Sequence, residues 1–242
     1  MPPLRTLVIG TGLAALPALY IRSRVLSLER DYPPRPPDSC TTLELRTPKA
    51  PGLQIGDVDV YAARVPVSAL LQSSNVSEGG PAALEDAWAR AFFQTPTIQL
   101  EAKCAGLGVR GEMGEMGFRP GQHIMGNGMH VLRPPARGTP LLTEWNMLPS
   151  AVRFFERIAA WGYPWRLMEG GRQEWSIGPV SRLPGEAEEM VEIRYAAAQD
   201  HRIVEGEKVP GKTVPPWAAR AHRAYARYLL DEAAREIRKK AA

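Results

Sequence analysis

The sequence contains too few cysteines and histidines for several common kinds of protein site. Only Cys40 and Cys104 occur among its 242 residues, so a disulfide scaffold is excluded and a reducing compartment is the simpler expectation. The four histidines do not have the spacing of zinc ligands. Gly-x-Ser-x-Gly, phosphate-loop and His-Glu-x-x-His motifs are also absent, which disfavours covalent hydrolases and nucleotide hydrolases. We therefore expect neither a metal nor a cofactor.

The sequence also lacks a large excess of charge of one sign. Its net charge of +4 comes from residues 217–242, which are predicted to form a helix. A basic helix could contact anionic lipid or nucleic acid, but cations near the C-terminal end of a helix dipole explain this segment more simply. Nothing else in the sequence indicates nucleic acid, and we do not expect it as a partner.

Long apolar runs are missing except at residues 6–21, which have two incompatible interpretations. As a strand, a Gly-x-Gly turn and a helix, the segment at residues 8–15 would open a dinucleotide-binding fold. Against this, Pro17 would break the helix, at a cost of roughly 3 kcal/mol. The proline-rich residues 31–38 then follow, and such an extended segment cannot continue a parallel sheet.

As one continuous helix, residues 6–21 instead predict a membrane anchor. At about 1.5 Å per residue the helix would span about 24 Å, somewhat less than the roughly 30 Å of a hydrocarbon core. The arginines that follow the run favour a cytoplasmic location for the rest of the chain. A cleaved signal peptide and a mitochondrial presequence are the alternatives. We therefore predict an anchor in residues 1–30, a proline-rich linker at 31–56 and a membrane-associated, cytoplasmic domain at 57–242.

The sequence after the linker shows both strand and helix periodicities. Strands are predicted at residues 57–67, 118–125, 129–133, 141–147, 174–177 and 190–196, and helices at 81–95, 96–107, 150–161 and from 216 onwards. Short turns between consecutive strands indicate an antiparallel sheet, and the long last helix must bury its apolar stripe against that sheet. The predicted class is α+β: a curved antiparallel sheet gripping a long C-terminal helix, preceded by the hydrophobic anchor helix.

The order of these elements resembles the helix-grip superfamily, which contains START-like and polyketide-cyclase-like proteins. The resemblance covers residues 57–238 and includes Val-Glu-Ile-Arg-Tyr at 191–195 and His-Arg-Ala-Tyr-Ala-Arg-Tyr at 222–228. It implies a deep apolar cavity between sheet and helix that holds a lipid, a hormone or a polyketide-like metabolite. Because the superfamily includes cyclases, dehydratases and carriers, neither a reaction nor a catalytic residue can be transferred from it.

Four side chains are the candidate catalytic groups. His123 and His130 flank a predicted hairpin turn, where a four-residue loop would place them opposite each other and a two-residue loop would separate them. Glu144 precedes a tryptophan in a strand, so only one of the two neighbours can face a cavity. Arg172 could orient a carbonyl group or neutralise an enolate. For all four, an ordinary exposed position is the alternative.

Six further residues are candidates for contact with an apolar ligand, although ordinary core packing also explains each of them. They are Trp145, Trp175, Tyr195, Tyr225, Met125 and Met147. The predicted function is a cofactor-independent cyclase or isomerase that acts on a hydrophobic, polyketide- or terpenoid-like metabolite. The alternatives are a lipid or sterol carrier without enzymatic activity and a membrane-anchored structural or assembly protein.

Overall fold

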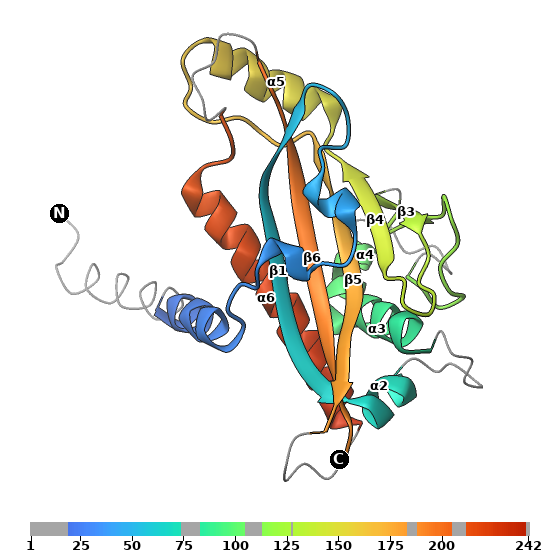
Figure 1. The fold of residues 1–242 in the computed structure, drawn as a ribbon. Helices are drawn as coiled ribbons and strands as arrows, with labels where there is room; N and C mark the ends of the chain where they lie inside the picture. Colours follow the sequence, from blue (N-terminus) through green and yellow to red (C-terminus); the bar gives the residue numbers. More distant parts are fainter. Residues whose placement is uncertain are drawn as a thin grey trace, which may run out of the picture.

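A single antiparallel sheet forms the centre of the molecule (Figure 1). The computed structural model describes residues 19–73, 83–104, 113–126, 128–182, 188–204 and 212–240. The strands within these ranges lie in the order β1-β6-β5-β4-β3-β2. Their bounds are β1 Leu53–Pro66, β2 His123–Ile124, β3 Met129–Arg133, β4 Leu141–Asn146, β5 Gly170–Ser181 and β6 Met190–Arg202.

Helices cover one face of this sheet. They are α2 (Val67–Ser73), α3 (Ala83–Phe93), α4 (Pro96–Cys104) and α6 (Pro216–Lys239), while α5 (Pro149–Ala160) lies near one end of the sheet (Figure 1). Helix α6 packs against β1 and places Leu229, Leu230 and Ile237 in the main core. The predicted α+β class, with an antiparallel sheet and a C-terminal helix packed on it, is confirmed.

The other face of the sheet is covered by the strap, as we call residues 32–50. It contains the short 3-10 helices η1 (Pro37–Ser39) and η2 (Leu43–Arg46), and it crosses β1, β6 and β5 (Figure 1). Leu45 of the strap is fully buried in a second, smaller core cluster that also contains Leu142. This segment lies within the predicted proline-rich linker at residues 31–56, but it packs against the sheet.

The predicted membrane anchor and the membrane-associated localisation are contradicted by the described residues. Among them, no helix combines the length and the apolar character that crossing a membrane requires. Residues 19–31 are helical, but this helix buries Leu28 in the core and pairs Arg24 with Asp231 of α6. It is therefore a charged helix packed on the domain. Residues 6–18 of the predicted anchor lie outside the described residues.

Candidate functional site

Two cavities adjoin each other where α6 crosses the sheet. The first, the apolar chamber, has a volume of about 130 Å³ and lies between β5, β6, the β2–β3 hairpin and helices α3, α4 and α6. Its lining is mainly aromatic and aliphatic, with Phe92, Tyr195 and Leu229 among its members. This is the place where the helix-grip resemblance implies a ligand cavity.

Aromatic stacking builds the wall of the chamber. Phe92 of α3 stacks on Tyr195 of β6 at 5.3 Å between ring centroids, and it meets Trp175 edge-on at the same distance. Such pairs are worth about 0.5–1.5 kcal/mol beyond the area that they bury. Because Trp175 is fully buried behind these rings, it supports the chamber wall without being part of the lining.

The candidates for ligand contact divide between the chamber and other places. Tyr195, Tyr225 and Met125 line the chamber. Trp145 packs over Gly171, where an added Cβ would lie only 2.9 Å from the indole nitrogen, so a side chain larger than glycine would displace the ring. Neither Trp145 nor Met147 lines the chamber.

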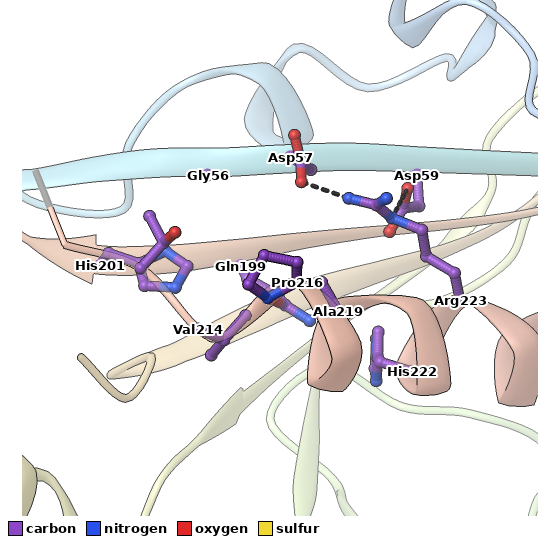
Figure 2. Close-up of a pocket in the computed structure, with 11 residues that line it drawn as sticks. Gly56, Asp57, Asp59, Gln199, His201, Val214, Pro216, Ala219, His222 and Arg223 are labelled. Carbon is purple, nitrogen blue, oxygen red and sulfur yellow. Dashed lines mark hydrogen bonds and ion pairs between the residues drawn. The ribbon is translucent and has the colours of Figure 1, made fainter. Parts of the chain in front are cut away.

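The second cavity, the polar cleft, has a volume of about 300 Å³. It opens where the register between β1 and β6 shifts near Ile55 and Val58, close to the first turns of α6 (Figure 2). Polar side chains from these three elements line it, namely Asp57, Asp59, Gln199, His201, His222 and Arg223. The ring of His222 borders both the cleft and the chamber, so the two cavities adjoin.

The charged side chains of the polar cleft, two acids and one arginine, are already paired with one another. The guanidinium of Arg223 contacts Asp57 at 2.5 Å and Asp59 at 3.2 Å (Figure 2). Burial raises the pKa of Asp59 against the opposing effect of Arg223. Burial also lowers the pKa of both His201 and His222, so neutral imidazoles are favoured. The cleft therefore combines an ion-paired group of charges with two neutral imidazoles that can form hydrogen bonds.

His201 is the least expected group in the cleft. Its side chain is only 1 % exposed, and within the described part of the chain neither ring nitrogen has a partner of good hydrogen-bond geometry, although the backbone of Gln199 acts on the ring and favours its protonated form. The ring lies against Gly56, where an added Cβ would be 2.9 Å from the ring carbon Cε1. A buried polar group without a partner costs about 1–3 kcal/mol, which makes such a group a candidate for ligand contact.

The four candidate catalytic residues form one cross-strand row. His123 pairs with His130, His130 with Glu144, and Glu144 with Arg172 in the register of neighbouring strands. The two histidine rings are 6.3 Å apart, as expected for the four-residue loop. However, Ile124 and Met129, their neighbours along the chain, face the core beneath the helices. The row therefore lies on the strap face of the sheet, away from both cavities.

The strap supplies partners for the acid and the arginine of this row. Lys49 forms an ion pair with Glu144. Arg172 forms a buried ion pair with Asp200, with distances of 2.9 and 3.0 Å to the two carboxylate oxygens. Within the described ranges, no group of His, Cys, Asp or Glu side chains could hold a metal ion. These contacts explain Glu144 and Arg172 as groups that bind the strap.

We predict that the free energy of unfolding of His201→Leu equals that of the wild type or exceeds it by up to about 1 kcal/mol. The reason is that the substitution removes buried nitrogens that lack partners. The folded-state pKa of His201 lies below the ordinary 6.5. As the pH falls through 6.5, the unfolded chain therefore binds more protons and stability is lost, by at most about 1.4 kcal/mol per pH unit for this group. Between pH 7.5 and pH 5.5, the free energy of unfolding of His201→Leu should therefore fall less than that of the wild type.

Urea unfolding at pH 7.5 and pH 5.5 measures both effects. His123→Leu is the matched control, because His123 is exposed and lies on the other face. A His201→Leu protein that is several kcal/mol less stable at pH 7.5 would contradict the prediction.

Comparisons with protein-family models, curated proteins and solved structures found no match to this chain. The resemblance to the helix-grip superfamily therefore stays a prediction.

Proposed function

We propose that this protein binds a small, largely apolar metabolite between the sheet and α6 without a cofactor. The observation that carries the proposal is the apolar chamber, which lies between sheet and helix and is walled by aromatic rings. Apolar, aromatic-lined pockets are the usual places where proteins bind small molecules, and this one is smaller than the roughly 300–1,000 Å³ that drug-sized ligands occupy. Its position agrees with the ligand cavity that the helix-grip resemblance implies.

The size of the chamber limits the ligand. A dry engineered cavity of about 150 Å³ accommodates benzene. The chamber, at about 130 Å³, therefore suits one six-membered ring or a short branched chain and is too small to enclose a sterol. We accordingly propose a carrier or binding protein for a metabolite with one such apolar group.

The location of the row formed by His123, His130, Glu144 and Arg172 favours binding over catalysis by those four groups. The row lies on the opposite face of the sheet from the chamber, and its acid and arginine are engaged by the strap and by Asp200. A cyclase or isomerase reaction stays a prediction that would need other groups at the chamber.

We predict that toluene binds to the chamber and that Ala226→Phe abolishes this binding. Ala226 lines the chamber on α6 and is buried, so a phenyl ring at this position would occupy the ligand's space. Chemical-shift changes during a toluene titration measure the affinity, and we expect a loss of at least about ten-fold, which corresponds to about 1.4 kcal/mol.

Ala221→Phe is the matched control for this experiment. It places the same side chain on an exposed position of the same helix and should leave toluene binding unchanged. If the wild type does not bind toluene, or if both variants bind it equally well, the chamber is not the ligand site.

A further inference from the structure

We infer that the polar cleft and the apolar chamber form one binding site, in which the cleft receives an uncharged hydroxyl or carbonyl group of the ligand. The inference rests on the proposed function for the apolar part of the ligand and adds the chemistry of its polar part. The ligand is then a neutral amphipathic molecule, such as an alcohol or a ketone attached to a single ring.

The continuity of the lining along α6 supports a single site. Ala219, His222 and Arg223 line the cleft, and Tyr225, Ala226 and Leu229 line the chamber. These positions succeed one another along one helix, and His222 belongs to both cavities. A ligand that lies along this part of α6 therefore passes from apolar to polar surroundings beside His222.

Unused hydrogen-bonding capacity in the cleft supports a polar ligand group. Both ring nitrogens of His201 are buried without a partner of good hydrogen-bond geometry, and the ring borders the cleft (Figure 2). A neutral imidazole donates from one nitrogen and accepts at the other. A hydroxyl group also does both, and a carbonyl accepts, so either group satisfies part of this capacity.

The ion pairs already formed in the cleft select against a charged ligand group. Arg223, the cation of the lining, is already paired with Asp57 and Asp59. A ligand carboxylate would have to compete with these two acids for Arg223, and a ligand ammonium would have to compete with Arg223 for the acids. His201 in turn senses the opposing charges of Asp200 and Arg166. Burying a charge without a dedicated partner is costly, whereas a neutral polar group needs only hydrogen bonds.

Four probes with the same phenylpropyl body test this inference on the full-length protein by NMR titration. They are propylbenzene, 3-phenylpropan-1-ol, 3-phenylpropanoate and 3-phenylpropylamine. We expect the alcohol to bind about five-fold more tightly than propylbenzene, the gain of one net hydrogen bond, and more tightly than the acid or the amine. His201→Leu should reduce the affinity for the alcohol to that for propylbenzene and leave propylbenzene binding unchanged.

The outcomes separate the two proposals. If propylbenzene binds and the alcohol binds no better, the cleft is not part of the site, while the proposed function stands. If the acid or the amine binds most tightly, the inferred ligand class is wrong. If neither propylbenzene nor toluene binds, the proposed function fails. The comparison of probes on the wild type needs no variant, and Gln199→Leu is a second cleft variant if His201→Leu does not fold.

Discussion

Replacing Glu174 with alanine is expected to lower the free energy of unfolding by about 3–5 kcal/mol. Glu174 is fully buried on the strap face of β5, where its carboxylate accepts four hydrogen bonds. Thr41 donates from its backbone nitrogen at 2.9 Å and its hydroxyl at 2.8 Å, and Thr42 donates likewise at 2.9 and 2.6 Å. The substitution leaves the two donors of Thr42 buried and unpaired, which costs more than the bonds themselves contribute, and it removes the two bonds from the more exposed Thr41.

The same variant should loosen the strap. Because Glu174 binds two consecutive residues of the strap, its loss should free the backbone on either side of the exposed Arg46 and Lys49 for cleavage by trypsin in the native protein. Urea unfolding and native-state trypsin digestion measure the two effects separately. Glu236→Ala, which removes an exposed acid from α6, is the matched control and should change neither. A Glu174→Ala protein within about 1 kcal/mol of the wild type would show that the strap is held by its apolar contacts instead.

The sheet and its last helix could be predicted from the sequence because they depend on local periodicity. Alternation marked the strands, proline marked the start of α6, and the glycine-rich turn marked the hairpin that brings His123 opposite His130. Alternation also separates Glu174 from Trp175, which do face opposite sides. It cannot reveal that both sides are covered, so alternation alone would place Glu174 in solvent.

One signal for the covered second face is present in the sequence. Residues 195–198 of β6 read Tyr-Ala-Ala-Ala without a polar residue, and all four are buried. A continuous apolar run is typical of a strand that is buried on both faces. A strand with one solvent-exposed face instead alternates between apolar and polar residues. The proline content of the strap instead predicts a linker. This prediction is ambiguous because proline is common in extended linkers as well as in segments packed on a sheet.

The candidate site could be predicted only in part, since the cavities depend on tertiary contacts. The resemblance to a helix-grip arrangement led to Tyr195 and Tyr225 in the chamber. The polar cleft was missed because His201 and His222 lie on different elements, and no spacing in the sequence indicates that α6 brings them to one cavity. The register shift in β1 that opens the cleft is marked only by Gly56, because a glycine inside a strand often accompanies a bulge, and Gly56 lies just before the strand predicted at residues 57–67.

Replacing Arg172 with methionine should lower the free energy of unfolding by about 3–5 kcal/mol, because it leaves the carboxylate of Asp200 buried without its cation. The two side chains are 5 % and 1 % exposed and pair at 2.9 Å. Arg172 also donates to the backbone carbonyl of Glu44, so its loss removes a contact to the strap. Arg202→Met is the matched control: this arginine is half-exposed in its ion pairs, and its loss should cost less than about 1 kcal/mol.

The double substitution Arg172→Met with Asp200→Leu distinguishes a structural ion pair from a chemical role. Apolar residues of similar volume can replace a buried ion pair at little net cost, since neither charge is then left without a partner. We expect the double variant to recover most of the stability lost by Arg172→Met, in a double-mutant cycle measured by urea unfolding. It should also bind toluene like the wild type, because the pair lies on the face away from the chamber. Wild-type stability combined with loss of toluene binding would instead connect Arg172 to the ligand.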